Sequence, residues 1–247
     1  MLLELHEKYT ISALHKFDGI NGGIANEILK GSFVNDLCEL TNEYSKVNNI
    51  LKKYVKARRE KGLLDHIPFY QSHWGKLSAL HCMANINNEF PEITHANILN
   101  WLELLEFLVF NIDQTTLEKR INEFEDILGT HVSELKFRLS HFLDTDNIIE
   151  AKYRVIGMIV HIIQDSYTVS HCKREGSDIM AFYCYSEQSK SEHKKYDRVL
   201  AEHEEKMLSD INDVLSQLLN EKTAIHLYKE ILSLSPLAVP SSSGNFV

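Results

Sequence analysis

The chain has 247 residues, of which 44% are apolar and 25% charged, and its formal net charge is −9. This length suits one large helical domain, and the composition is that of a globular protein. The negative charge argues against a broad nucleic-acid-binding face, because duplex binding depends on phosphate neutralisation by Lys and Arg. It does not exclude a small phosphodiester substrate, since bound metal ions can supply local positive charge.

Four prolines and ten glycines are few for this length, which favours long helices over a many-turned β fold. The cysteines form no CxxC pair and are expected to be free thiols: Cys38, Cys82, Cys172 and Cys184. The N-terminus lacks a basic region followed by a continuous apolar run, so no signal peptide is predicted. We therefore expect a chain that is cytoplasmic as made, with no transmembrane segment.

Apolar residues recur at helical spacing along almost the whole chain. The predicted helices span 3–17, 24–30, 36–60, 75–84, 93–112, 115–127, 130–142, 147–167, 193–220 and 222–233. Residues 168–191 are polar and aperiodic, which predicts a long loop, uncommon inside a domain unless it has a function. The Ser-rich tail from Pro236 is expected to be flexible. The sequence thus predicts an all-α fold, with one multi-helix domain over 1–235 and a tail over 236–247.

The strongest chemical signal is HIIQD, followed six residues later by another histidine. His161 and Asp165 are four residues apart, so on a helix they share a face, and His171 follows beyond the predicted helix end. Neutral imidazole and carboxylate are suitable ligands for zinc. A buried histidine bonded to an aspartate is the alternative for a single such pair, and the third ligand-type residue favours a metal site.

A second pair, His193 and Asp197, has the same spacing near the start of the last long predicted helix. Alone it would indicate a solvated charged face, because three basic residues surround it. Two such pairs, separated by a loop that itself contains His171, match a site with several metal ions better than either pair alone.

These motifs resemble, in order along the chain, those of the zinc-dependent phospholipase C and S1/P1 nuclease superfamily. The segment from His161 resembles the family's H-x-x-x-D-x5-H motif, and HKKYD resembles its later H-x-x-x-[ED] pair. LHEKYTISAL resembles the opening H-x-x-I-[TV] motif, which would make His6 a ligand, and LKGSFVND resembles a turn that delivers the carboxylate of Asp36. A middle histidine is also expected, and FYQSHWGKLSALHCMA offers His73 or His81, with His81 preferred.

The resemblance touches residues 1–36 and 66–200, and it implies a phospholipase C/P1 nuclease-type fold that binds two or three zinc ions. The implied ligands are Met1, His6, Asp36, His73 or His81, His161, Asp165, His171, His193 and Asp197. His171, His193 and Asp197 would hold one metal. A second would be held by His161, Asp36 and the middle histidine, while Asp165 would bridge toward a third at His6 and the N-terminus. Tyr183 and Tyr185 would either shape the substrate entrance or cover the core.

The N-terminus departs from the family pattern. Family members are usually exported, and their new N-terminal residue, typically Trp, ligates a metal through its amine and carbonyl, whereas this sequence starts with Met1. We hypothesise that the Met1 amine completes the site, and the alternative is a site with two metals. An N-terminal tag that left metal content and activity unchanged would contradict the hypothesis.

The resemblance implies a metal-dependent phosphodiester hydrolase in which zinc activates water and Asp36 assists as a catalytic base. We expect phospholipase C-type cleavage of phospholipid head groups, with transient contact with a membrane surface and no stable nucleic-acid partner. The alternatives are an S1/P1-type nuclease, or a non-catalytic translocated interaction protein with a structural metal site. Because a phospholipase would endanger its own cell, export independent of a signal peptide is a further hypothesis, and a purely cytosolic location would count against it.

Overall fold

The computed structural model of the protein describes residues 1, 3–35, 75–111, 148–185 and 188–242. These residues are mostly helical, as predicted, with a small two-stranded sheet that was not predicted. In chain order the elements are α1 (Leu3–Leu14), α2 (Gly22–Val34), the 3-10 helix η3 (Gly75–His81), α4 (Pro91–Phe110), α8 (Ile148–Asp165), β1 (Cys172–Glu175), β2 (Asp178–Phe182), α9 (Lys190–Tyr196), α10 (Ala201–Leu219) and α11 (Ile225–Ile231). The predicted helices 36–60, 115–127 and 130–142 lie outside the described residues.

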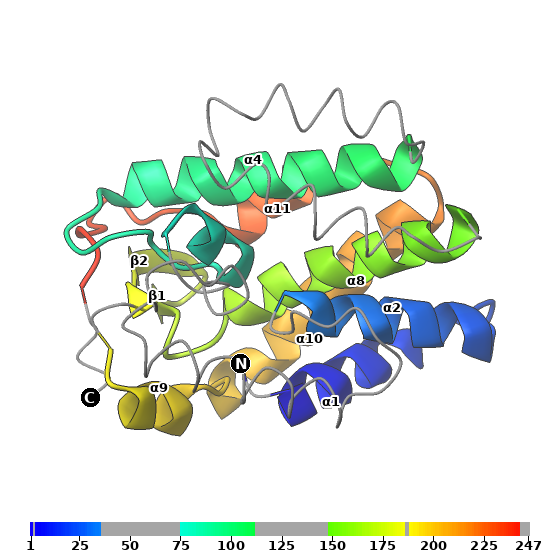
Figure 1. The fold of residues 1–247 in the computed structure, drawn as a ribbon, viewed down its shortest axis with the longest axis horizontal. Coiled ribbons are helices and arrows are strands. Elements are labelled where there is room, and N and C mark those ends of the chain that lie inside the picture. Colours follow the sequence, from blue (N-terminus) through cyan, green and yellow to red (C-terminus); the bar gives the residue numbers. More distant parts are fainter. Residues whose placement is uncertain (2, 36–74, 112–147, 186–187, 243–247) are drawn as a thin grey trace, which may run out of the picture.

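Helix α8 is the centre of the fold and packs against α1, α2, α4 and α10. Every residue from 155 to 168 is buried, because neighbouring helices cover α8 on all sides. In Figure 1, α8 lies between α4 above and α2 below. A helix that is surrounded in this way needs apolar residues around its whole circumference. A polar side chain on the buried part of α8 is therefore costly unless it has a hydrogen-bonding or ionic partner.

The contact between α2 and α8 is a close approach of two backbones at Gly31 and Gly157. A Cβ atom on Gly31 would lie 2.0 Å from the carbonyl oxygen of Arg154, and one on Gly157 would lie 2.0 Å from that of Ile28. Only glycine permits this crossing. The LKGSFVND segment, expected to form a turn, instead continues α2 as a helix to Val34. The crossing brings the carbonyl of Ser32 against α8.

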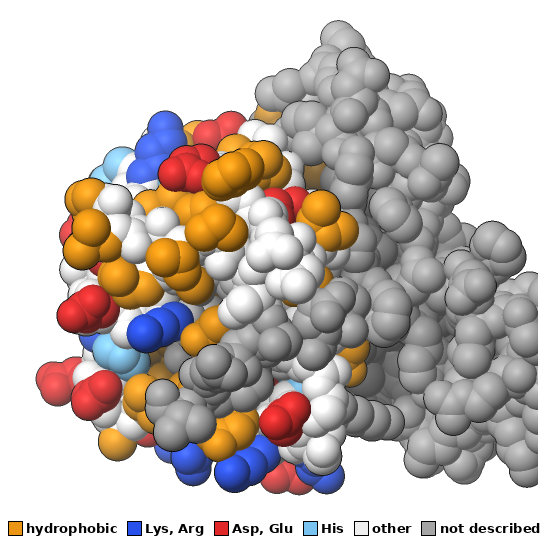
Figure 2. Space-filling model, turned by 90° about the vertical axis from the view of Figure 1, so that its left-hand side faces the viewer, with side chains coloured by type: hydrophobic (Ala, Val, Ile, Leu, Met, Phe, Trp, Pro, Cys, Tyr) orange, Lys and Arg blue, Asp and Glu red, His pale blue; other side chains and the backbone are white. Residues whose placement is uncertain are grey.

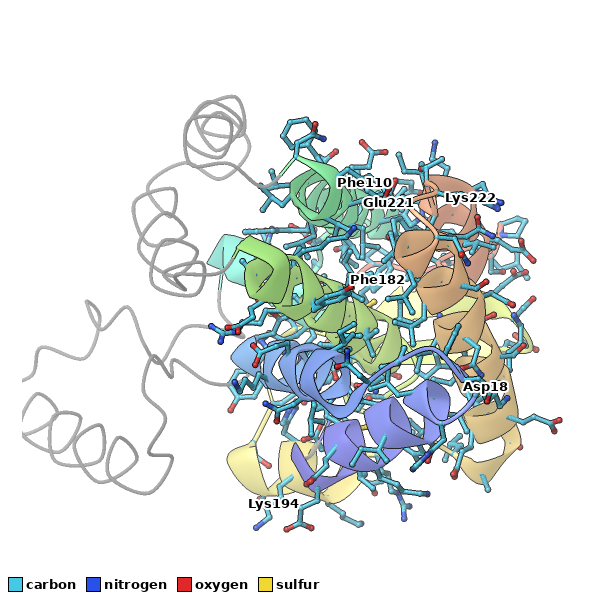
Figure 3. The ribbon with its side chains drawn as sticks, turned by 90° about the vertical axis from the view of Figure 1, so that its right-hand side faces the viewer. Asp18, Phe110, Phe182, Lys194, Glu221 and Lys222 are labelled. Carbon is cyan, nitrogen blue, oxygen red and sulfur yellow. The ribbon has the colours of Figure 1, made fainter. Side chains whose placement is uncertain are left out.

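The predicted loop 168–191 contains a β-hairpin and the start of α9, so the prediction of an irregular segment was wrong. Strands β1 and β2 pair antiparallel, from Cys172 opposite Phe182 to Glu175 opposite Asp178, and Gly176 takes the left-handed conformation in the turn (φ 59°). The strands were missed because each is short and β1 is largely polar. Phe182 is buried, and Figure 3 shows it inside the fold.

The predicted helix 193–220 is two helices, α9 and α10, with a break over residues 197–200. The break occurs because this backbone pairs with the segment that follows α8. Val169 N–H donates to the carbonyl of Arg198 (3.0 Å) and Ser170 N–H to that of Tyr196 (3.1 Å). A continuous helix would use these carbonyls internally. The break fixes Asp197 at the end of α9, facing Ser170.

The described part of the C-terminal tail, residues 236–242, hydrogen-bonds to the rest of the fold. Val239 N–H donates to the carbonyl of Met180 and Ser241 N–H to that of Glu89, both at 2.9 Å. The predicted domain boundary at 235 and the flexibility of the tail stay predictions. Cys82, Cys172 and Cys184 are buried, Cys82 and Cys172 are free thiols, and Cys38 lies outside the described residues. None of the helices in the described ranges is long and apolar enough to cross a membrane.

Candidate metal centre

Histidine and aspartate side chains from distant parts of the sequence meet where α8 ends. They form two buried groups, and within each group one candidate ligand atom per residue lies within 4.8 Å of the others. The inner group consists of His6, His161 and Asp165, and the outer group consists of His171, His193 and Asp197. Each group could hold a metal ion.

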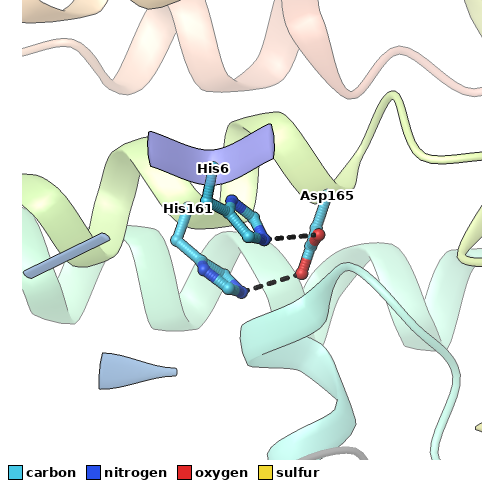
Figure 4. Close-up of side chains that lie close together, drawn as sticks. All are labelled: His6, His161 and Asp165. Carbon is cyan, nitrogen blue, oxygen red and sulfur yellow. Dashed lines mark ion pairs between the residues drawn. The ribbon is translucent and has the colours of Figure 1, made fainter. Parts of the chain in front are cut away.

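The inner group lies wholly on helices, with His6 on α1 and the other two residues on the last turn of α8. Asp165 faces an imidazole with each carboxylate oxygen: Oδ2 lies 2.8 Å from His161 Nε2 and Oδ1 lies 3.4 Å from His6 Nε2 (Figure 4). The two rings stack with their centroids 4.0 Å apart. All three side chains are fully buried, so the protein interior fixes their geometry.

The outer group lies on the segment between α8 and β1 and on the short helix α9. Asp197 Oδ1 is 3.4 Å from His171 Nε2 and 3.8 Å from His193 Nε2. The hydroxyl of Ser170 donates to the same oxygen (3.1 Å), and the partly buried Tyr185 ring lies edge-on to His193. His193 and Asp197 are 8% and 7% exposed, whereas the inner group is inaccessible. The outer group is therefore the side of the centre nearer to solvent.

His81 and the Met1 amine connect the two groups. His81 Nδ1 lies 3.1 Å from both Asp165 Oδ2 and His161 Nε2. The Met1 amine is buried and lies 2.8 Å from Asp165 Oδ1 and 2.8 Å from Asp197 Oδ1. This amine therefore spans both carboxylates of the centre.

Each of the five imidazoles presents one ring nitrogen to a carbonyl oxygen. The pairs are His6 Nδ1 with Gln164 Oε1 (2.5 Å), His81 Nε2 with Asn35 O (3.0 Å), His161 Nδ1 with Ser32 O (2.7 Å), His171 Nδ1 with His81 O (2.8 Å) and His193 Nδ1 with Gln188 Oε1 (2.7 Å). Because a carbonyl only accepts, the contacting nitrogen carries the hydrogen. The opposite nitrogen of each ring then faces the centre, and metal-binding histidines are oriented in this way.

Gln164 and Gln188 were not predicted from the sequence, and one serves each group. Gln164 is held by its own amide, which donates to the hydroxyl of Thr10 (3.0 Å), and the amide of Gln188 donates to the carbonyl of Ser170 (2.8 Å). A usable signal exists for Gln164, since it is a polar residue inside the otherwise apolar run between His161 and Asp165. Gln188 lies in an aperiodic polar segment and carries no such signal.

The two carboxylates of the centre are ionised although both are buried. Burial by itself would raise the pKa of Asp165, but the charges of His171, the Met1 amine and His161 outweigh burial and hold that pKa well below its usual range. Burial likewise opposes ionisation of Asp197, and the same amine and His171 hold its pKa far below normal. Both carboxylates are therefore ionised at neutral pH.

The histidines differ in their affinity for protons. Burial lowers the pKa of His6, helped by the neighbouring His161, and burial together with the charge of His171 lowers the pKa of His193 to about 3. His171 is the exception: burial opposes its charge, but Asp165 outweighs burial and raises its pKa to about 9. The ionised carboxylates and the neutral imidazoles of His6 and His193 form a donor set that fits a divalent metal.

The structure brings together most of the predicted ligands. Met1, His6, His81, His161, Asp165, His171, His193 and Asp197 lie in the centre, whereas Asp36 and His73 lie outside the described residues. The outer group is the predicted first metal set. The two other predicted sets meet at the inner group: Asp165 lies beside His6 and the Met1 amine, and His161 lies 3.1 Å from His81. The choice between His73 and His81 and the role of Asp36 stay predictions.

The fold and the centre together define a mostly helical protein with two adjoining histidine–aspartate groups at the end of a buried helix. No family model, curated protein or solved structure matches this chain. The function therefore has to be inferred from the chemistry of the centre.

Proposed function

We propose that this chain is a zinc-dependent phosphodiester hydrolase of the phospholipase C type, with the multi-helix fold of the phospholipase C/P1 nuclease superfamily, and that it cleaves phospholipid head groups. The observation that carries the proposal is the convergence of five oriented imidazoles, two ionised carboxylates and the Met1 amine in one centre. Two adjoining groups suit the cleavage of a phosphodiester, because neighbouring metals can act together on one phosphate.

The choice of zinc rests on ligand type and spacing. Imidazole nitrogen and carboxylate oxygen are typical zinc ligands, and ligands about 2.0–2.1 Å from a tetrahedral ion are roughly 3.3 Å apart. In the two groups, the carboxylate oxygens lie 2.8–3.8 Å from the imidazole nitrogens, a range that includes this spacing. The set lacks the all-oxygen character that magnesium and calcium prefer.

The chain's own residues have distinct parts in this proposal. Asp165 and Asp197 are ionised and supply the negative charge that retains the cations. The carbonyl-bound histidines supply lone pairs in fixed directions, so little reorganisation is needed on binding. The bound metals would supply Lewis acidity toward the phosphate and activate water. Their positive charge would also attract an anionic substrate to a chain whose net charge is −9.

The first experiment is the metal content of the purified full chain by mass spectrometry, after zinc reconstitution and removal of free metal. His161→Ala tests the inner group and His193→Ala the outer group, and His226→Ala, at an exposed histidine on α11, is the matched control. We expect at least one zinc ion per group in the parent chain, a loss in each site variant and no loss in the control. A parent chain that binds no metal after reconstitution would contradict the proposal.

The second experiment assigns the reaction. The zinc-loaded chain is offered a soluble short-chain phosphatidylcholine and, in parallel, single-stranded DNA and RNA. Release of phosphocholine supports the phospholipase C assignment, and release of nucleotides alone would replace it with the nuclease alternative. Stoichiometric metal without hydrolysis of any substrate, together with unfolding of His161→Ala, would indicate a structural metal site in an interaction protein.

A further inference from the structure

Five large apolar side chains project into solvent at one end of the molecule. They are Ile86 (62% exposed), Phe90 (61%), Ile93 (50%), Leu237 (74%) and Val239 (54%), called here the apolar patch. They come from the loop before α4, the first turn of α4 and the C-terminal segment. Figure 2 views this end and shows hydrophobic side chains gathered on it. Exposed apolar side chains are ordinary when scattered, but a cluster marks an interaction site.

The two segments that carry the apolar patch are fixed to each other by the backbone and by Ser241. Asn88 N–H donates to the Ser241 carbonyl and Ser241 N–H to the Glu89 carbonyl, both at 2.9 Å. The Ser241 hydroxyl donates to the carbonyl of Ile86 (2.7 Å) and accepts from Glu89 N–H (2.8 Å). The apolar side chains are therefore held outward by a hydrogen-bonded frame, and docking would require little ordering of the backbone.

The apolar patch is almost free of charge. Segments 84–94 and 234–242 contain two charged residues, Glu89 and Glu92. Glu89 is buried, and its carboxylate accepts from the hydroxyl of Thr94 and the backbone N–H of Asn85. Only Glu92 presents a charge at the surface of these segments. Such a surface can enter the interfacial region of a bilayer at a low desolvation cost.

Basic side chains and the less buried side of the centre lie at the same end of the molecule. Isolated backbone bridges join Ala84 to Cys184 and Tyr183 to Ser242, which connects the patch segments to the residues that directly follow β2. In Figure 1 the hairpin, α9 and the start of α4 share this end. Lys194, Lys195 and Arg198 are exposed, and Lys194 projects outward from α9 (Figure 3). They flank His193 and Asp197 in the sequence.

We propose that this end docks on the surface of a phospholipid bilayer that contains anionic lipid. The apolar patch enters the interfacial region, and the basic side chains on and after α9 contact lipid phosphates. A membrane fits better than a folded partner because the side chains project from turns and a helix start. The inference rests on the proposed function, because docking would direct the outer group toward the head groups of its substrate.

The test uses the full chain in co-sedimentation with vesicles of phosphatidylcholine, with and without phosphatidylglycerol. We expect binding that phosphatidylglycerol strengthens. Removing two apolar anchors, in Phe90→Ser/Leu237→Ser, should weaken vesicle binding by about tenfold or more. Ile11→Ser is the matched control, because Ile11 is exposed on α1 (38%) away from the patch. Lys194→Gln/Lys195→Gln should weaken binding to the anionic vesicles alone.

Circular dichroism establishes that each variant is folded before its binding is interpreted. Absence of vesicle binding in the parent chain, or equal binding by Phe90→Ser/Leu237→Ser, would overturn the docking proposal. Concentration-dependent dimerisation that the same double variant abolishes would assign the patch to a second copy of the chain instead. Hydrolysis of soluble short-chain phosphatidylcholine without vesicle binding would overturn docking alone. Vesicle binding retained by a zinc-loaded chain that hydrolyses no phosphodiester would instead overturn the proposed function.

Discussion

The inner and outer groups contain the same residue types, two histidines and one aspartate, but the fold holds them differently. The inner group is fully buried on α1 and α8 and depends on the glycine crossing of α2 and α8. The outer group lies on short elements, held by backbone hydrogen bonds between 168–170 and 196–199, and it is slightly exposed.

Two sets of the same residue types can therefore be coupled to the stability of the fold in different ways. Damage to the inner group disturbs the central helix contacts and should reduce global stability. The outer group can open locally, because short surface elements unfold at a lower free-energy cost than a central helix. We expect the inner group to bind metal as part of the folded core and the outer group to exchange its metal more readily.

The largest expected effect comes from breaking the crossing that supports the inner group. Gly157→Ala would place a Cβ atom 2.0 Å from the carbonyl oxygen of Ile28, so α2 and α8 must separate. The free energy of unfolding should fall by about 3 kcal/mol or more, as measured by denaturant titration. Gly19→Ala is the control, since a Cβ there meets nothing within 4 Å. Equal unfolding free energies for the two variants would show that the close approach of α2 and α8 does not contribute to stability.

Removing the charge of each aspartate should affect stability and metal binding differently in the two groups. Asp165→Asn leaves a buried amine and several imidazoles without their counter-charge, and should cost about 3–5 kcal/mol of unfolding free energy. Asp197→Asn, at a slightly exposed position, should cost less. Metal analysis should show loss from both groups in the first variant and from the outer group alone in the second. A larger loss of stability in Asp197→Asn than in Asp165→Asn would contradict this difference between the groups.

Substituting each glutamine should perturb metal binding at one group only. Gln164→Leu removes the acceptor for His6 Nδ1, and Gln188→Leu removes the acceptor for His193 Nδ1. Each change should weaken metal binding at its own group by about 10–100-fold, measured by competition with a chelating dye. Gln→Glu at the same position keeps the acceptor and should restore binding. Loss of both metals in either variant would show that the groups act as one site.

The pH dependence should reflect His171 of the outer group. Its pKa is raised from 6.5 to about 9, so its charge stabilises the metal-free chain fully below about pH 6.5, and this contribution is lost as the pH rises through about 9. Metal must displace that proton, so affinity should rise about tenfold per pH unit up to about pH 9. Calorimetry in buffers of different ionisation enthalpy measures the released proton, and a heat independent of buffer would contradict the assignment.

Local spacing in the sequence was enough to predict much of the centre. The structure brings together the two H-x-x-x-D pairs, and it also brings in His6 and His81, which only the family resemblance had implied. The periodicity of apolar residues also predicted α4 and α8 to within about two residues at each end. Spacing succeeds here because i and i+4 side chains share one face of a helix wherever that helix packs.

Spacing failed where partners are distant along the chain. The break between α9 and α10 depends on backbone pairing with residues 168–170, and the β-hairpin depends on burial of one strand against the helices. The contact between His6 and Gln164 joins side chains that lie 158 residues apart. No local pattern specifies such contacts.

Sequence patterns therefore predicted the helical class and most of the histidines and aspartates that meet at the end of α8, because periodicity and residue chemistry are local properties. The packed fold was needed to establish which histidines share a group, which ring nitrogen faces the centre, and where the Met1 amine lies. These features depend on how α1, α2 and α9 pack around the end of α8. A metal centre is built from atoms that approach within a few ångströms, and that approach is a property of the packed chain.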